Sequence, residues 1–289
     1  MSHMPLVSNK YGEITQYQKA DSVDILNIQH SLCSASVSLY GGQVLNWQPK
    51  GQPPVLWLSD TSQYQQGKAI RGGIPLCWPW FGAYKDAGNH GFARQMRWEL
   101  LEADITEHKV ELTLVAAGEN LSHLWPTPFK LVQKISFSAQ FQQQLTISNL
   151  SDQPVEFTSA FHSYFQVSSP EYTSVSGLNG VKFDDKNTLL TAQQDILDNC
   201  VGPIDRIYHD HNTQQLKDSG WQRVIEVEST HCQQWVLWNP GKEVASSMND
   251  LHSGGESEYV CLEAANTEWQ NIPAQKSVTL KQKISVIPF

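Results

Sequence analysis

Apolar and polar residues alternate over much of this 289-residue chain. The alternation is clearest in six segments, residues 23–28, 32–39, 110–115, 131–137, 145–149 and 278–287. A period of two residues is that of a β-strand, which turns successive side chains to opposite faces and buries one of them. Short polar or glycine-containing gaps at residues 40–42, 107–108 and 149–152 favour consecutive antiparallel hairpins. We therefore predict an all-β fold, a large antiparallel β-sandwich with few short helices.

Helical patterns are rare in the chain. Short helices are predicted only around residues 119–124 and over 241–248, where the preceding Pro240 suits a first helical turn. The least strand-like stretches are residues 59–96 and 179–220, and long connections at the rim of a sandwich commonly supply a binding site. No fixed-period repeat, charge block or proline-rich linker divides the chain, so one domain spanning residues 1–289 is expected.

The formal net charge is -9, which argues against nucleic acid or an anionic membrane surface as a partner, because both require a basic face. A small anion can still bind where a few arginines converge. No segment approaches the ~18 consecutive apolar residues of a membrane helix, and residues 1–11 lack a signal-peptide pattern, so a cytoplasmic protein is expected. No CxxC pair occurs, and reduced thiols are expected at the five cysteines, Cys33, Cys77, Cys200, Cys232 and Cys261.

Residues 71–82 and 90–94 form the first candidate for a functional site. The first segment, Arg71-Gly-Gly-Ile-Pro-Leu-Cys-Trp-Pro-Trp-Phe-Gly82, is too irregular for a strand and too apolar for a free loop, so it should fold back onto the protein. The second, His90-Gly-Phe-Ala-Arg94, places a histidine and an arginine four residues apart around a glycine that allows close backbone approach. Arg71 and Arg94 could converge on an oxyanion, or each could pair with a carboxylate.

Two strand-like segments carry the candidate acid–base residues. Alternation over residues 157–166 places three phenylalanines on one face and His162 on the other, among small, hydrogen-bonding and aromatic side chains typical of a ligand-binding concavity. Residues 259–265 read as a buried strand interrupted by a single carboxylate, Glu263. Burying an ionised carboxylate is costly, so Glu263 is expected either to face a polar cleft or to have partners in a salt bridge.

Other features point less directly to chemistry. The ten tryptophans are consistent with a large aromatic core or with sugar binding, since aromatic rings offer flat apolar faces to a pyranose. His209 and His211 lie in a polar, loop-like segment without a third ligand at a characteristic spacing, so no metal site is predicted. Glycine-rich phosphate loops of the nucleotide-binding type are absent from the sequence.

Together these segments resemble those of the glucose-6-phosphate 1-epimerases, or hexose-6-phosphate mutarotases, the hexose-phosphate branch of the aldose 1-epimerase superfamily. The resemblance follows the order of the chain, through residues 71–82, 90–94, 161–166, 202–206 and 262–266, whereas residues 172–199 carry no motif. It implies a galactose mutarotase-like β-supersandwich with the site on the concave face of its larger sheet. The implied roles are Glu263 as general base, His162 as general acid, His90 near the ring oxygen, Asp205 on a sugar hydroxyl, and Arg71 and Arg94 on the phosphate.

The resemblance therefore implies an isomerase that interconverts the α and β anomers of a hexose 6-phosphate. Ring opening requires one base at the C1 hydroxyl and one acid at the ring oxygen, a task for which no metal or cofactor is expected. With reference pKa values of ~4.3 and ~6.5, an ionised Glu263 beside a protonated His162 would suit it. The alternatives are a mutarotase for unphosphorylated aldoses and a non-catalytic carbohydrate-binding module. Glycoside hydrolysis is less favoured, because it normally uses two opposed carboxylates.

Overall fold

The computed structural model describes residues 4–193 and 196–289 and contains three antiparallel sheets. The N-terminal sheet has the order β1 (Met4–Asn9), β2 (Gly12–Gln18), β3 (Asp24–His30), β4 (Cys33–Ser38) and β5 (Gln43–Pro49). The second sheet, here called the long sheet, has the order β13 (Thr173–Val175), β17 (Gln214–Asp218), β18 (Arg223–Thr230), β21 (Ser277–Pro288), β10 (Gln140–Asn149), β9 (Phe129–Phe137), β8 (Val110–Gly118) and β7 (Glu99–Ile105).

The third sheet carries most of the residues singled out in the sequence, and is called the site sheet below. Its order is β15 (Leu190–Gln193), β14 (Lys182–Asp185), β16 (Ile204–Tyr208), β19 (Gln234–Asn239), β20 (Tyr259–Ile272), β11 (Val155–Phe161) and β6 (Leu76–Cys77), and β12 (Tyr164–Gln166) pairs with β20 beyond the end of β11. The described helices are short: α1 (Gly241–Ala245) and five 3-10 turns, Ala20–Ser22, Ala93–Gln95, Pro170–Tyr172, Ser176–Leu178 and Gly255–Ser257.

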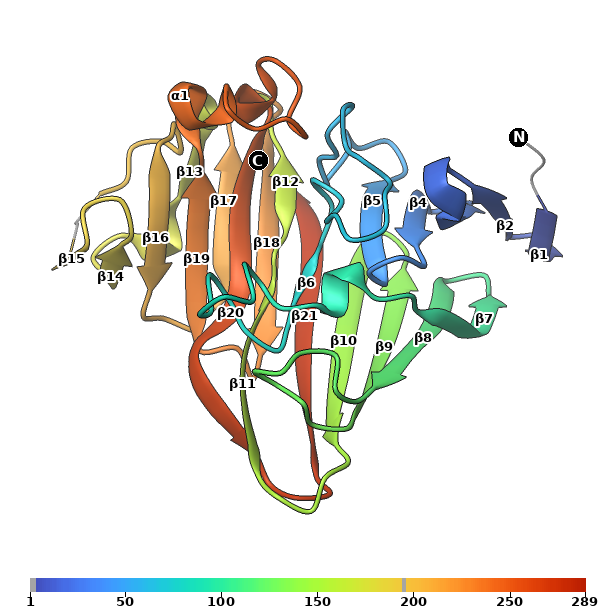
Figure 1. The fold of residues 1–289 in the computed structure, drawn as a ribbon. Helices are drawn as coiled ribbons and strands as arrows, with labels where there is room; N and C mark the ends of the chain where they lie inside the picture. The colour runs from blue at the N-terminus through green and yellow to red at the C-terminus, as the bar shows by residue number, and fades with distance from the viewer. Residues whose placement is uncertain (1–3, 194–195) are drawn as a thin grey trace.

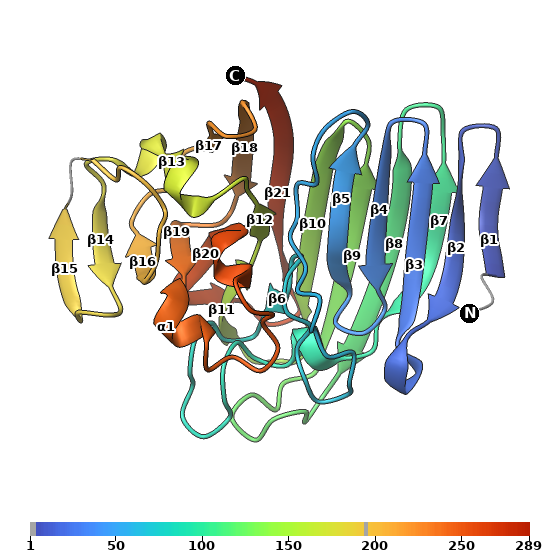
Figure 2. The same ribbon diagram turned by 90° about the horizontal axis from the view of Figure 1, so that it is seen from above.

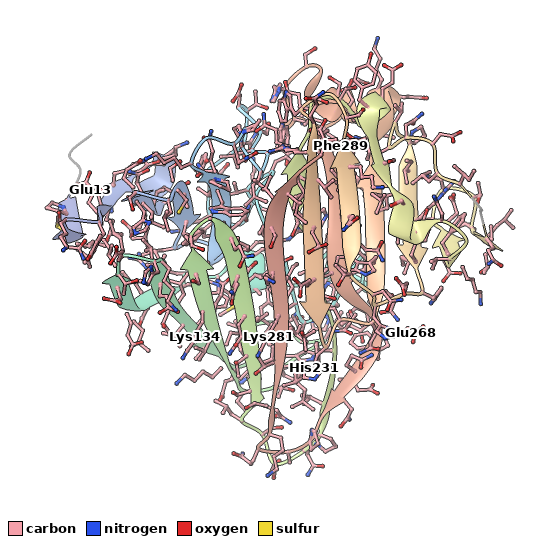
Figure 3. The ribbon with its side chains drawn as sticks, turned by 180° about the vertical axis from the view of Figure 1, so that it is seen from behind. Glu13, Lys134, His231, Glu268, Lys281 and Phe289 are labelled. Atoms are coloured by element: carbon pink, nitrogen blue, oxygen red, sulfur yellow. The ribbon has the colours of Figure 1, made fainter. Side chains whose placement is uncertain are left out.

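The N-terminal sheet and the site sheet both pack on one face of the long sheet (Figures 1 and 2). The N-terminal sheet lies over β7–β10, the site sheet lies over β17, β18 and β21, and the main core draws residues from all three sheets. The opposite face of the long sheet is polar and exposed, and Lys134 and Lys281 are labelled on it in Figure 3. The period of two is visible in β9, where every second residue from Phe129 to Phe137 is buried. This arrangement confirms the all-β prediction.

All six predicted strand segments form strands, but the connections between them differ from the prediction. Residues 40–42 and 107–108 do turn between paired neighbours, β4–β5 and β7–β8. Residues 149–152 instead carry the chain from β10 in the long sheet to β11 in the site sheet, so they are not a hairpin. A polar gap between two alternating segments marks a turn but does not reveal whether the second strand stays in the same sheet.

The irregular stretches were predicted only in part. Residues 59–96 contain a single named strand, the two-residue β6, as expected, but residues 179–220 contain β14, β15, β16 and β17. Residues 119–124 form a turn rather than a helix, closed by an isolated bridge between Ser122 and Trp125, and the predicted helix at 241–248 is limited to α1. Within the described residues, no helix combines the length and apolar character needed to cross a bilayer.

Candidate active site

His162 lies where the strand pairing changes, between the end of β11 and the start of β12. The strand presents Phe157, Phe161 and Phe165 to the main core, and His162 faces the other way, as the alternation predicted. The backbone N–H of His162 leaves the sheet ladder and donates to the carbonyl of Pro75 at 3.1 Å. His162 is 7% exposed, and its imidazole stacks on the ring of Tyr164, with centroids 4.8 Å apart and planes 7° from parallel.

A chain of buried glutamine side chains fixes the backbone next to His162. The hydroxyl of Ser163 donates to Gln282, Gln282 donates to Gln143 at 2.7 Å, Gln143 donates to Gln133, and Gln133 donates to the carbonyl of Gly42 at 2.7 Å. The three glutamines and Ser163 are all buried, so each amide needs this partner to offset its lost hydration. The chain connects the core of the long sheet to the site.

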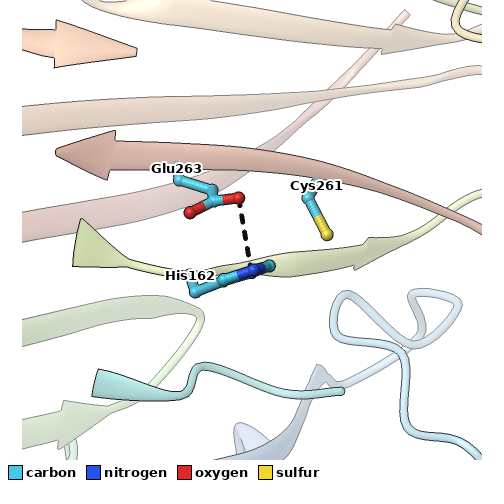
Figure 4. Close-up of side chains that lie close together, drawn as sticks. All are labelled: His162, Cys261 and Glu263. Carbon is cyan, nitrogen blue, oxygen red and sulfur yellow. Dashed lines mark ion pairs between the residues drawn. The ribbon is translucent and has the colours of Figure 1, made fainter. Parts of the chain in front are cut away.

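Glu263 occupies the middle of β20, on the face of the site sheet turned away from the main core. Small and apolar side chains surround it on that face: Cys77, Ala160, Ile207, Val236 and Ala265. Glu263 is 1% exposed, and its Oε1 lies 3.4 Å from Nδ1 of His162 (Figure 4). The other oxygen, Oε2, is buried without a hydrogen-bond partner among the described residues. The sequence prediction of a buried carboxylate is confirmed, with His162 as its partner.

Burial shifts the pKa values of this pair in opposite directions. Loss of hydration raises the pKa of the Glu263 carboxyl well above its usual value, and nearby Asp205 adds to the increase, while Arg94 opposes it. Loss of hydration also lowers the pKa of His162 well below its usual value, with further contributions from His90 and the two arginines. Burial therefore favours the neutral acid and the neutral imidazole, the reverse of the charged pair expected from reference pKa values.

His90 is held beside His162 by an unusual backbone conformation. Its φ of 65° is in the left-handed region, and the following Gly91 has no room for a side chain, because a Cβ there would lie 2.0 Å from the carbonyl oxygen of Trp78. The backbone N–H of Gly82 donates to Nδ1 of His90 at 3.1 Å, which leaves Nε2 as the protonated nitrogen of the neutral ring. The two histidine rings meet edge to face at 5.5 Å, and burial lowers the pKa of His90 to about 3.

The two arginines converge on one cavity of about 340 Å³, which Tyr164 also lines. Arg71 is anchored on both sides: its Nε donates to Asp250 at 3.1 Å, and its Nη1 donates to the Tyr164 hydroxyl at 2.9 Å. Arg94 donates from Nη2 to the carbonyl of Asn89, and its buried Nε has no hydrogen-bond partner in the described part of the chain. Carboxylate pairing, the alternative considered from the sequence, therefore applies to Arg71, while Arg94 keeps a free donor.

Asp205 belongs to β16, which β19 separates from β20, and it shares the face of Glu263. Its Cα is paired with Trp238 on β19, and Trp238 is paired with Cys261 on β20, so Asp205 lies two strands away from the catalytic candidates. Desolvation raises its pKa, which marks a partly buried carboxyl rather than a solvated one. The structure thus brings all six residues predicted for the site to one region of the molecule.

A sequence profile of the aldose 1-epimerase family matches residues 24–286, most of the chain. The chain belongs to the aldose 1-epimerase family. Among its relatives, a protein of Escherichia coli provisionally named glucose-6-phosphate 1-epimerase is 33% identical over 97% of this chain and 96% of its own length. A Salmonella typhimurium protein of the same provisional name is also 33% identical, over 93% of this chain and 92% of its own length. Membership in this family supports an epimerase, and thus an isomerase.

The solved structures agree with the fold of this aldose 1-epimerase family member. The crystal structure of a provisionally identified mutarotase from Salmonella typhimurium superimposes with a TM-score of 0.89 at 30% sequence identity, covering 99% of this chain and 97% of the other. The predicted galactose mutarotase-like supersandwich is therefore confirmed.

Several residues of this site in the epimerase were not singled out in the sequence. Tyr164 connects Arg71 to the His162 ring, and its position two residues after His162 on an alternating strand was the available signal. Asp250 comes from a loop after α1 with no local motif, so only the fold reveals its contact with Arg71. Lys68 is exposed, lines the same cavity and donates to Gln63 at 2.6 Å.

His209 and His211, which were considered as metal ligands in the sequence, lie outside the site. Nε2 of His209 lies 2.8 Å from Asp184, and Nδ1 lies 3.9 Å from Glu268, whereas His211 is exposed. These contacts are those of a surface ion pair, which agrees with the interpretation of solvated histidines.

Proposed function

We propose that this epimerase interconverts the α and β anomers of a hexose 6-phosphate, most directly glucose 6-phosphate. The observation that carries the proposal is the position of the two arginines, which line one cavity with Tyr164, the residue stacked on His162. A sugar phosphate is largely dianionic at neutral pH, and a protein with a net charge of -9 repels it at long range. Attraction must therefore come from local cations such as these.

In the proposed reaction the sugar ring lies against the face that carries Glu263 and His162. From the neutral pair, the proton of the Glu263 carboxyl first moves to His162. Glu263 then removes the proton of the C1 hydroxyl while His162 delivers its proton to the ring oxygen, and the C1–O5 bond breaks to give the open aldehyde. Rotation about C1–C2 and closure in the opposite sense give the other anomer. In the same proposal His90 lies near the ring oxygen with its Nε2–H, and Asp205 accepts a hydrogen bond from a sugar hydroxyl.

Glu263 and His162 share one titratable proton, which lies either on the carboxyl or on the imidazole. This shared proton sets the expected pH dependence. A second proton binds only near the lowered pKa of His162, and the single proton leaves only near the raised pKa of Glu263. We therefore expect kcat for glucose 6-phosphate to stay level as the pH falls through ~6.5, the ordinary histidine pKa, and to decline only on the alkaline side.

The measurement is kcat at saturating substrate between about pH 5.5 and 9, with the spontaneous rate subtracted. Saturation matters because the substrate phosphate itself titrates with a pKa near ~6 and would distort kcat/KM. An acid limb of kcat centred near ~6.5 would show that His162 titrates as an ordinary solvated histidine, and would contradict the assigned proton distribution.

Removal of Arg94, the arginine with a free donor, should erase most of the preference for the phosphorylated sugar. We expect glucose 6-phosphate to exceed glucose in kcat/KM, and Arg94→Ala to lose about 1.5–3 kcal/mol of that preference, the scale of a hydrogen bond between charged groups and a factor of ~10–150. Arg71→Ala should act in the same direction. Planar guanidinium groups donate in pairs to phosphate oxygens, so Arg94→Lys should restore only part of the loss.

The experiment compares anomer exchange of the two sugars by polarimetry or magnetisation-transfer NMR. Lys85→Ala is the matched control, because Lys85 is an exposed cation near the same segment that does not line the cavity. Equal efficiency on glucose and glucose 6-phosphate in the unmodified enzyme would favour the alternative, a mutarotase for free aldoses. Sugar binding without any exchange would favour the carbohydrate-binding module.

A further inference from the structure

A buried thiol that the proposed mechanism does not use stands beside the catalytic pair. Cys261 precedes Glu263 by two residues in β20, so both side chains occupy the same face of the site sheet. Cys261 is fully buried, and its Cα is paired with Tyr164 on β12. One ligand atom from each of His162, Cys261 and Glu263 lies within 4.8 Å of the other two (Figure 4).

The three groups supply the nitrogen, sulfur and oxygen donors that Zn²⁺ accepts in proteins. Zinc bonds of ~2.0–2.3 Å in a tetrahedron separate neighbouring ligand atoms by about 3.3–3.8 Å. The 3.4 Å between Nδ1 of His162 and Oε1 of Glu263 already falls in this range. The ligand atoms lie within 4.8 Å of one another, so the widest separation must shorten by about 1 Å when the ion binds, which requires the side chains to turn toward it.

Two of these ligand groups also lack the partners that buried polar atoms normally have. Oε2 of Glu263 is buried without a partner among the described residues, and Nδ1 of His162 makes no hydrogen bond there, although Oε1 of Glu263 lies 3.4 Å away. A buried polar atom without a hydrogen bond destabilises the fold, so a ligand that engages both atoms would recover free energy. Both side chains are more than nine-tenths buried and lie on the same side of the strand pair as the thiol.

We propose that His162, Cys261 and Glu263 form an inhibitory site for Zn²⁺, with water as the fourth ligand. As the ion binds, the thiol S–H and the carboxylic acid O–H release their protons to solvent, and the imidazole binds as the neutral base. One dication and two monoanions leave the site with no net charge, as before binding, which suits a buried environment. The inhibition, but not the binding, rests on the proposed function, because the ion would occupy the catalytic acid and base.

The binding test uses Zn²⁺ alone, in competition with a chromophoric chelator. We expect one Zn²⁺ per chain, and a loss of affinity of at least about 10–100-fold in Cys261→Ser and Cys261→Ala, since even groups that only support a metal ligand contribute that much. Glu263→Gln should weaken binding as well. Co²⁺ used as a spectroscopic substitute should give a near-ultraviolet thiolate band that disappears in the Cys261 variants. Cys232→Ser, which alters a buried core thiol outside the cluster, should bind like the parent protein.

The activity test measures anomer exchange in zinc-buffered solution, with each variant compared with its own zinc-free rate. We expect inhibition that a chelator reverses, that sugar phosphate opposes by competition, and that the Cys261 variants largely lose. Two results would contradict the proposed zinc site. One is an active enzyme whose zinc binding does not depend on the Cys261 thiol, and the other is equal zinc inhibition of the parent and Cys261→Ser. One zinc per chain with the cobalt band, in a protein that exchanges no anomers, would uphold the site and contradict the proposed function instead.

Discussion

Replacement of Glu263 by glutamine is expected to lower kcat for anomer exchange by about 10²–10⁴-fold, the usual contribution of a positioned acid or base. The amide has the shape of the carboxylic acid but can neither take up nor release the proton of the C1 hydroxyl. Because burial already favours the neutral form of Glu263, the neutral amide should fit without loss of folding. The rate is measured at saturating glucose 6-phosphate, and the free energy of unfolding is measured by urea denaturation.

Glu268→Gln is the matched control, since Glu268 lies on the same strand β20 but is exposed to solvent. That variant should retain the parent rate. Turnover close to that of the parent in Glu263→Gln, with the fold intact, would remove Glu263 from the mechanism and leave its burial as a structural feature only.

Replacement of His162 by asparagine should separate catalysis from binding. The ring oxygen loses its proton donor, so kcat should fall by about 10²–10⁴-fold. The arginines that line the cavity remain, so KM for glucose 6-phosphate should change little. The smaller side chain also removes the stacking on Tyr164, a contact worth about 0.5–1.5 kcal/mol, and thermal unfolding will report this cost separately.

The control for this experiment is His211→Asn, at an exposed histidine outside the site. A variant at position 162 whose affinity collapses while turnover at saturation persists would identify His162 as a binding residue. If affinity and kcat both fall because part of the variant is unfolded, the unfolding measurement gives the folded fraction. The rate per folded molecule is then compared with that of the parent.

The alternating segments were sufficient to predict four of the eight strands of the long sheet and two of the five strands of the N-terminal sheet. Their strands have one face on the core and one in solvent, so the alternation of apolar and polar residues predicts which positions are buried, as in β9 and β10. The site sheet is less regular, because the face that carries Glu263 is also buried, so both faces of β20 carry apolar residues. Strands β14 to β17 were missed for a related reason: they are short, polar or at an edge, and carry little periodic signal.

The proton distribution in the site is a property of the fold rather than of the residue types. A glutamate and a histidine side by side in water would favour the charged pair, whereas desolvation at 1% and 7% exposure favours the neutral one. Likewise the sequence could not distinguish an arginine bound to a carboxylate from one with a free donor. Asp250, which neutralises Arg71 and not Arg94, lies 179 residues further along the chain.

The sequence by itself determined the all-β class, the strand that turns its phenylalanines to the core and His162 away from it, and the buried carboxylate at Glu263. Each of these depends on residue type and local period, which act over a few neighbouring positions. Only the tertiary structure decided that His162 and Glu263 meet at 3.4 Å, that Ser163 is held by Gln282, and that the thiol of Cys261 joins the pair. Those contacts depend on which strands become neighbours, and that is set by packing of the whole core rather than by any segment alone.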